Sequence, residues 1–157
     1  MLHEDELPVA VTTVEGLVAA QFPQWAGEPV RFHDSAGSSN WIFRLGEERY
    51  ARLRRRPAQP TKVETEQRWL DRLGPLLPAR IPRVLGRGEP GSGFPLPWTV
   101  LDWLPGEPAF SDRVTDEAAL AEDVAAFVRA LRAVDPTGGP PPNEDNNWRA
   151  CPLAERD

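Results

Sequence analysis

Cysteine, histidine and lysine are scarce in this chain of 157 residues. It contains one cysteine, Cys151, and two histidines, His3 and His33. This scarcity excludes an internal disulfide and any site built from several cysteines, and neither histidine has the neighbours of a metal site or a catalytic triad. We therefore predict no metal site. The only lysine is Lys62, so a phosphate-binding cation on a strand would have to be an arginine, which presents a planar fork of five donors.

Long apolar runs are also missing. No segment approaches the ~20 apolar residues of a membrane-spanning helix, and the acidic N-terminus is not followed by the apolar segment of a signal peptide. With a single cysteine, this predicts a cytoplasmic protein without a membrane partner. The net charge of −6 argues against a nucleic-acid partner. Five arginines fall between Arg49 and Arg56, but alternation along a strand would divide their side chains between two faces.

What the chain does have is a folded composition and clear periodicity. Apolar residues make up 40% of it, with six tryptophans, and its length suits one domain or one lobe of a larger protein. Apolar positions three and four residues apart predict three helices, with Thr12, Thr61 and Thr115 as their N-caps. The predicted helices cover residues 12–21, 62–73 and 120–134. Thr12 and Thr61 are each followed three residues later by glutamate, the pattern of a capping box.

Strand candidates lie between these helices. They cover residues 29–33, 41–45, 49–53 and 99–104, and the Pro- and Gly-rich stretch 81–98 predicts turns and edge strands. The three residues Gly46, Glu47 and Glu48 are short enough for a hairpin. This order predicts an α+β fold, a small antiparallel sheet with one packed helix, joined by a short hinge to a helical part.

One pairing across two segments is the most informative feature. Glu66 falls inside the apolar stripe of the second helix, which Val63, Leu70 and Leu73 form. A carboxylate on a buried stripe needs a partner, because leaving it unpaired costs several kcal/mol. Arg52, on the strand just upstream, is the natural candidate. Such a pair is either a structural ion pair or a strand cation that a helix carboxylate aims at nucleotide phosphates, as in kinase-like enzymes.

Two further segments have a functional and an ordinary interpretation. The loop Gly37-Ser38-Ser39-Asn40 offers backbone N–H groups and hydroxyls to an anion, but it also suits an ordinary hairpin. The junction Asp102-Trp103-Leu104 could hold a flat aromatic base between apolar side chains, or it is simply a strand that ends at a turn.

Taken in order, these segments resemble the aminoglycoside phosphotransferase family, small-molecule kinases with a protein-kinase-like fold. The resemblance covers nearly the whole chain, and its segments are 37–46, 51–53, 66–70, 94–98, 103–107 and 147–153. It implies ATP as the nucleotide, with Arg52 as the phosphate-binding strand cation and Glu66 as its helix partner. The nucleotide-binding residues that it implies are Gly37, Ser38, Ser39, Arg52, Glu66, Asp102, Trp103 and Leu104.

The sequence departs from that family in three places. Ser39 stands where related members often carry an acidic residue, and the ring of Tyr50, two residues before Arg52, could crowd a nucleotide base. The family's His-Gly-Asp catalytic loop and its magnesium-binding aspartate segment do not occur in the 157 residues. We therefore predict no catalytic residue in this chain and no ligands for magnesium, and expect the chain alone to be incompetent as a kinase.

The leading hypothesis is the ATP-binding half of a small-molecule kinase. Residues 1–104 would form the nucleotide-binding lobe, and residues 105–157 the hinge exit, the first helix and the start of a truncated second lobe. A small-molecule acceptor would then need a C-terminal half. The alternative is a non-catalytic module that binds a partner or associates with itself through the 120–134 helix, whose apolar stripe would otherwise be exposed.

Overall fold

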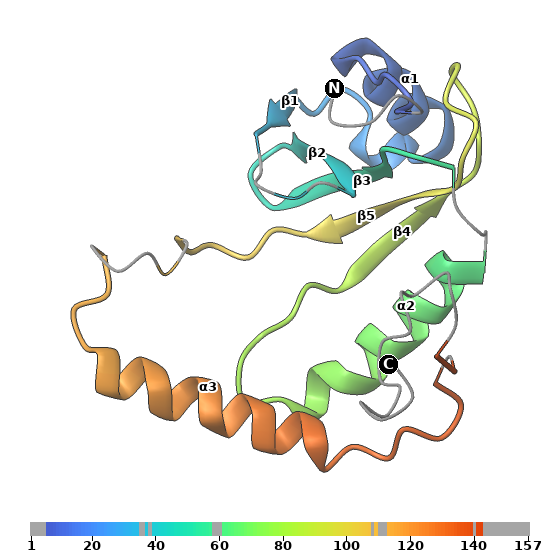
Figure 1. The fold of residues 1–157 in the computed structure, drawn as a ribbon. Helices are drawn as coiled ribbons and strands as arrows, with labels where there is room; N and C mark the ends of the chain where they lie inside the picture. The colour runs from blue at the N-terminus through green and yellow to red at the C-terminus, as the bar shows by residue number, and fades with distance from the viewer. Residues whose placement is uncertain are drawn as a thin grey trace.

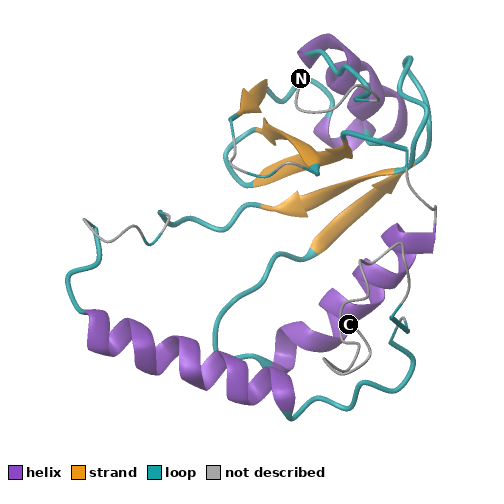
Figure 2. Cartoon of the chain, in the orientation of Figure 1, coloured by secondary structure: helices purple, strands orange, loops and turns teal. Residues whose placement is uncertain are grey.

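The computed structural model describes residues 6–34, 37, 39–57, 61–107, 109, 113–139 and 141–142, with the backbone alone for residues 61–63. Five strands form one antiparallel sheet in the order β1-β2-β3-β5-β4. Helices flank the sheet, which gives an α+β fold (Figures 1 and 2). The elements are α1 (Val11–Gln21), η1 (Pro23–Trp25), β1 (Val30–His33), β2 (Asn40–Leu45), β3 (Arg49–Arg54), α2 (Thr61–Leu73), η2 (Gly74–Leu76), β4 (Val84–Gly88), β5 (Trp98–Asp102) and α3 (Glu117–Arg132).

The predicted order of elements is confirmed. The first three strands begin and end within one residue of the predicted positions, and β4 lies at the edge of the sheet, inside the stretch predicted to hold turns and edge strands. Residues 46–48 connect β2 to β3 as a hairpin turn. Gly46 adopts a φ of 58° there, a backbone conformation that costs glycine little. The last strand, β5, ends at Asp102, two residues earlier than predicted.

The hydrophobic core lies between the sheet and α1. Val14, Leu17 and Val18 of α1 are buried against one face of the sheet, as their helical spacing predicts. The strand residues of this core, at alternating positions of β2, β3 and β5, are Phe43, Leu45, Ala51, Leu53, Trp98 and Val100. Because one face of each of these strands carries these side chains, the opposite face of β3 is available for polar groups.

The helix starts differ from the predicted N-caps. α1 begins at Val11 with Ala10 as N-cap and without a side-chain cap, so Thr12 lies inside the first turn. The N-cap of α3 is Asp116, whose Oδ1 accepts a hydrogen bond of 2.9 Å from the Ala119 N–H, and not Thr115. The predicted capping box at Thr61 involves a side chain outside the described part of the chain.

α2 approaches the other face of the sheet from the side opposite α1 (Figure 1). None of its described side chains belongs to the core or to the partly buried residues around the core. Leu70 and Leu73 are half-buried, so the expectation of a buried apolar stripe is wrong for this half of the helix; Val63 is not described. The reason is that α2 meets the sheet through polar side chains: Glu66 pairs with Arg52, and Gln67 accepts a hydrogen bond from Arg87.

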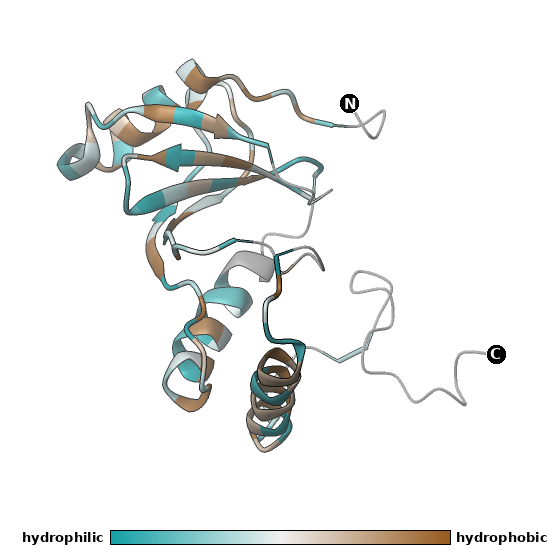
Figure 3. Cartoon of the chain, turned by 90° about the vertical axis from the view of Figure 1, so that its left-hand side faces the viewer, coloured by the Kyte–Doolittle hydropathy of each residue, from teal (hydrophilic) through white to brown (hydrophobic). Residues whose placement is uncertain are grey.

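α3 lies on the same side of the sheet as α2, next to the C-terminal end of that helix (Figure 1). Arg68 and Arg72 of α2 donate hydrogen bonds to the carbonyl oxygens of Gly138 and Thr137, just after α3. The hydrophobic residues of α3, brown in Figure 3, include four large exposed ones. These are Leu120, Val124, Val128 and Leu131. No helix in the described part of the chain combines the length and the apolar character needed to cross a membrane.

Candidate functional site

The register of β3 divides its residues between two environments. Ala51 and Leu53 are buried in the core with α1, so alternation directs Tyr50, Arg52 and Arg54 to the face that α2 approaches. Antiparallel pairing sets these three residues opposite Arg44, Ile42 and Asn40 of β2. A mostly polar strip therefore runs along β2 and β3 on the side away from the core.

Arg52 and Glu66 form a two-point ion pair between β3 and α2. Arg52 Nη1 donates to Glu66 Oε1 at 2.8 Å, and Arg52 Nη2 donates to Glu66 Oε2. This parallel arrangement is the strongest geometry that an arginine and a carboxylate adopt. The Glu66 side chain is 37% exposed, so the pair lies at the edge of an open face. The predicted pairing is confirmed.

A small pocket opens beside this pair. Its volume is about 60 Å³, well below the ~300–1,000 Å³ of pockets that enclose whole ligands. The residues that line it are Asn40, Arg52, Arg54, Glu66, Pro97, Trp98 and Thr99. Two arginines, one carboxylate and neutral polar groups suit one small anionic group, such as the end of a larger ligand.

Arg54 is the charged residue of this pocket that we did not predict. Its half-buried side chain makes no hydrogen bond or ion pair with any residue that the structure describes. Burial lowers its pKa below the ordinary arginine value, the Glu66 carboxylate opposes that shift, and the neighbouring Arg52 adds to it. The sequence does indicate its position, because Arg54 is two residues beyond Arg52 and alternation along a strand places both side chains on one face.

The predicted loop residues lie next to this pocket in sequence. Gly37 and Ser39 are exposed, and Ser38 lies outside the described residues. Asn40 begins β2 and lines the pocket. Arg55 holds the end of the loop, since its N–H donates to the Ser39 carbonyl at 3.1 Å and its Nε donates to the Asn40 carbonyl at 3.3 Å.

Arg55 is itself held by the N-terminal segment. Its guanidinium lies 3.8 Å from the ring centroid of Trp41 and forms an ion pair of 3.6 Å with the buried Glu6 carboxylate. The Leu7 N–H donates to the Arg55 carbonyl at 2.6 Å, and the Leu7 carbonyl accepts from Trp41 Nε1 at 2.9 Å. Residues 6 and 7 thus attach the N-terminus to the strand ends that carry the loop.

Asp102 does not join the pocket. In the sheet it pairs with Arg49, and Arg52 pairs with Thr99, so the side chains of Asp102 and Arg52 leave opposite faces. Asp102 Oδ2 accepts from Arg80 at 3.2 Å and from Arg83 Nε at 3.1 Å. Burial alone would raise the pKa of Asp102, but hydrogen bonds from the backbone N–H and guanidinium of Arg83 outweigh it and hold the pKa below its ordinary value.

Trp103 lies on the same side of the sheet as Tyr50. The two ring centroids are 5.8 Å apart in an edge-to-face arrangement, and His33 meets Trp103 the same way at 5.0 Å. The Arg44 guanidinium lies 4.0 Å from the centroid of the Trp103 ring. Burial raises the pKa of the Tyr50 hydroxyl. Leu104 follows as a half-buried residue. Trp103 and Leu104 therefore lie just after the end of β5, and neither lines the Arg52 pocket.

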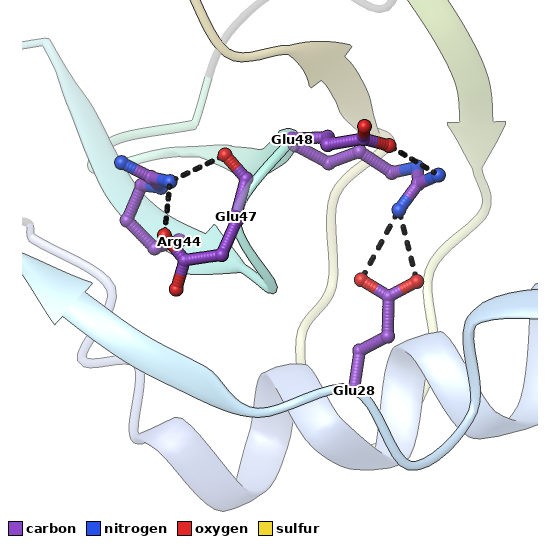
Figure 4. Close-up of polar contacts among 5 residues, drawn as sticks. Glu28, Arg44, Glu47 and Glu48 are labelled. Atoms are coloured by element: carbon purple, nitrogen blue, oxygen red, sulfur yellow. Dashed lines mark hydrogen bonds and ion pairs between the residues drawn. The ribbon is translucent and has the colours of Figure 1, made fainter. Parts of the chain in front are cut away.

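Ion pairs fix the β2–β3 turn next to this exit (Figure 4). Arg49 donates to Glu28 at 2.9 and 3.2 Å and to Glu48 at 3.5 Å. Arg44 donates to the Glu47 carbonyl at 2.6 Å, and the Glu48 carbonyl accepts from the Trp103 N–H at 2.7 Å. A larger pocket of about 510 Å³ lies here, lined by Glu47, Glu48, Arg49, Arg80, Arg83, Leu85, Asp102, Trp103 and Pro105.

The described residues do not fit a magnesium site. Within the part of the chain that the structure covers, no group of three or more histidine, cysteine, aspartate or glutamate side chains could hold a metal ion. Glu66, the carboxylate nearest the small pocket, is occupied by Arg52. No step of a reaction is therefore assigned to a metal held by these residues.

Solved structures of aminoglycoside phosphotransferases have the same fold as this chain. The GDP and kanamycin complex of APH(2")-IIia is 20% identical with a TM-score of 0.65, and the match covers 76% of this chain and 41% of that one. The GDP complex of wild-type aminoglycoside 2'-phosphotransferase-IIIa is 20% identical with a TM-score of 0.64, and the match covers 76% of this chain and 40% of that one. The streptomycin–ATP–APH(2")-IIa ternary complex is 17% identical with a TM-score of 0.58, and the match covers 82% of this chain and 41% of that one. This chain thus spans about 41% of the length of these proteins.

Sequence comparison assigns the family. A search of curated protein sequences gives no match. The profile of the phosphotransferase enzyme family (APH) matches residues 13–156, which is most of the chain. That span includes the sheet, the Arg52–Glu66 pair and all three helices except the first two residues of α1. The chain therefore belongs to the phosphotransferase enzyme family and has the kinase-like fold of the aminoglycoside phosphotransferases.

Proposed function

We propose that this chain supplies the nucleotide-binding part of an ATP-dependent small-molecule kinase. Residues 1–104 form the nucleotide-binding lobe in this proposal, and residues 105–157 form the hinge exit, the helix α3 and the start of a second lobe. The overall reaction is phosphoryl transfer to a hydroxyl of a small acceptor, which would need a C-terminal half to bind it.

The observation that carries the proposal is the two-point pair of Arg52 and Glu66. It joins a strand to a helix across an open face beside a pocket that suits a phosphate group. Transfer of a phosphoryl group is catalysed mainly by positioning and by stabilising charge, so a fixed cation at the phosphates is the first requirement. Solved relatives with this fold are complexes with GDP or ATP, which supports a nucleotide as the ligand.

Binding, and not turnover, is the property to test on this chain. The sequence contains no His-Gly-Asp segment, and the described residues offer no magnesium site. Phosphoryl transfer also needs a base or water-positioning residue and metal ions. We infer that residues 1–157 bind the nucleotide and do not transfer its phosphate.

The test is calorimetric titration of the purified chain with ATP and with GTP. Binding at millimolar concentration or tighter is expected for the wild type, and Arg52→Ala should weaken it tenfold or more, because a charge-assisted contact is lost. Arg132→Ala, at the exposed end of α3, makes the same change of charge away from the pocket and should bind like the wild type. Absence of binding by the wild type, or equal binding by Arg52→Ala, would contradict the proposal.

One observation favours the alternative, a non-catalytic module that associates with itself. The exposed residues of α3 line an apolar groove of about 610 Å³, and Val124 is 54% exposed. This alternative predicts no nucleotide binding and a molar mass that rises with concentration. Sedimentation of the wild type and of Val124→Gln tells the two apart, since only a dimer formed through α3 would dissociate in the variant.

A further inference from the structure

The charges of the small pocket are unevenly compensated. Both terminal nitrogens of Arg52 donate to the Glu66 carboxylate, so the positive charge of Arg52 is largely balanced and its two outer donors are in use. Arg52 keeps only its remaining N–H groups for another ligand. A pocket whose cation was Arg52 alone would therefore attract an anion weakly.

Arg54 supplies a second positive charge, which Glu66 influences electrostatically but with which it forms no ion pair. It lines the same pocket as Arg52, and alternation places both side chains on one face of β3. No hydrogen bond or ion pair joins Arg54 to another residue in the described part of the chain. No described residue therefore takes up any of its five N–H donors, which form a planar fork, the geometry that binds two oxygens of one phosphate.

The surroundings of Arg54 suit an anion in two more ways. Asn40 is its cross-strand partner in the β2–β3 register and lines the same pocket, so an amide that can donate lies opposite the guanidinium. The fall in the pKa of Arg54 through burial means that its charge is disfavoured without a counter-ion. Arginine stays protonated in proteins, so a bound anion relieves that cost.

We propose that Arg54 is the principal anion-binding residue of this pocket and that it holds the terminal phosphate of a bound nucleoside triphosphate. Arg52, oriented by Glu66, then contacts the same phosphate chain as a second cation. The volume of about 60 Å³ admits only the end of a ligand of that size, so the ligand class is a polyphosphate whose terminus enters here. This inference rests on the proposed nucleotide-binding function and names the residue that recognises the phosphate.

The experiment is a titration of the full chain with inorganic tripolyphosphate, ATP and adenosine at low ionic strength, where charge contacts are least screened. The variants are Arg54→Ala and Arg54→Lys, with Arg52→Ala for comparison and Arg132→Ala as the control. Circular dichroism establishes that each variant is folded. If Arg54→Ala is not folded, Arg54→Lys, which keeps most of the length of the side chain, and Arg54→Gln, which keeps a shorter polar one, provide the test.

The expected result separates phosphate from base recognition. Arg54→Ala should weaken the binding of tripolyphosphate and ATP tenfold or more, while any binding of adenosine stays unchanged. Arg54→Lys should fall between Arg54→Ala and the wild type, because lysine keeps the charge and loses the planar fork. A purely structural role for Arg54 would change the binding of all three ligands alike.

Other results would overturn the inference, and they distinguish its failure from a failure of the proposed function. If Arg54→Ala binds tripolyphosphate and ATP like the wild type while Arg52→Ala does not, the inference fails and the proposed function stands. If the wild type binds tripolyphosphate through Arg54 but does not bind ATP, the pocket takes a bare polyphosphate only, and both the nucleotide function and the inference fail. If the wild type binds neither ligand, both fail.

Discussion

Replacement of Arg55 by methionine is the sharpest test of how the N-terminal segment supports the pocket. The Arg55 and Glu6 side chains are 8% and 0% exposed, and 3.6 Å separates Arg55 Nη1 from Glu6 Oε1. Arg55→Met keeps most of the volume of the side chain and removes its charge, which leaves the Glu6 carboxylate buried without that counter-charge. Removal of one partner of a buried ion pair costs about 3–5 kcal/mol.

This cost is large for a chain of this size. Small proteins are stable by ~5–15 kcal/mol in total, so the loss is about a third to a half of a free energy of unfolding in the middle of that range. At roughly 2–4 °C per kcal/mol, the melting temperature should fall by about 6–20 °C. The assay is urea unfolding followed by tryptophan fluorescence, with Arg132→Met as the exposed control. The free energies of unfolding of the wild type and the control should agree within the ~0.5 kcal/mol expected of a surface change.

A double-mutant cycle isolates the pair from the other contacts of Arg55. Glu6→Leu combined with Arg55→Met replaces both charges by apolar groups, and such a replacement is often neutral or stabilising. The two single losses should therefore exceed the loss in the double variant by about 1 kcal/mol or more. A loss below about 1 kcal/mol for Arg55→Met, or full additivity of the two changes, would refute the view that this pair anchors the N-terminus.

Three other predictions concern the sheet and α3. Gly88→Ala should destabilise the fold by about 1–3 kcal/mol or more in thermal unfolding, because a Cβ there would lie 2.0 Å from the Trp98 ring. The control Gly74→Ala should be nearly neutral, because a Cβ at that position meets nothing within 4 Å. The folded-state pKa of Asp102 is lowered, so its stabilising effect is complete above the unfolded pKa of ~3.9 and is lost as the pH falls through the folded pKa. Asp102→Asn should therefore lower stability at neutral pH and flatten the acid side of the stability–pH curve, and an unchanged acid side would contradict this. Val124→Gln should change the free energy of unfolding of the monomer by no more than ~0.5 kcal/mol in urea titrations, because Val124 is an exposed residue of α3.

The secondary structure followed from local patterns. Helical spacing located α1 through Val14, Leu17 and Val18, and these same residues form its buried face. Alternation and a three-residue turn located β2 and β3. The pairing of Arg52 with Glu66 was also predicted, from a carboxylate among apolar helix residues with a cation on the strand upstream, although Leu70 and Leu73 are only half-buried.

Features that depend on register or distant packing did not follow from the sequence. The position of Asp102 required the pairing of β5 with β3, and the strand pattern alone does not say that Asp102 faces Arg83 and Arg80. Glu6 belongs to an acidic terminus that gives no sign of burial, yet it is the partner of Arg55. Thr115 was misassigned because Asp116, one residue later, is an equally good N-cap. Thr12 was misassigned because α1 begins at Val11, with Ala10 as an N-cap that makes no side-chain hydrogen bond.

The polar attachment of α2 to the sheet bears on what the Arg52–Glu66 pair does. With Glu66 37% exposed, the pair is screened by solvent, and pairs of this kind contribute only about 0–1 kcal/mol to stability. The core lies on the other face of the sheet and contains no described residue of α2. A strong two-point geometry is therefore kept where it adds little to stability, on a helix that polar contacts attach to the sheet. This combination favours a positioning role for Glu66: a change in the position of α2 would release the outer donors of Arg52 to a ligand in the pocket, while Arg54 keeps its charge available in either position.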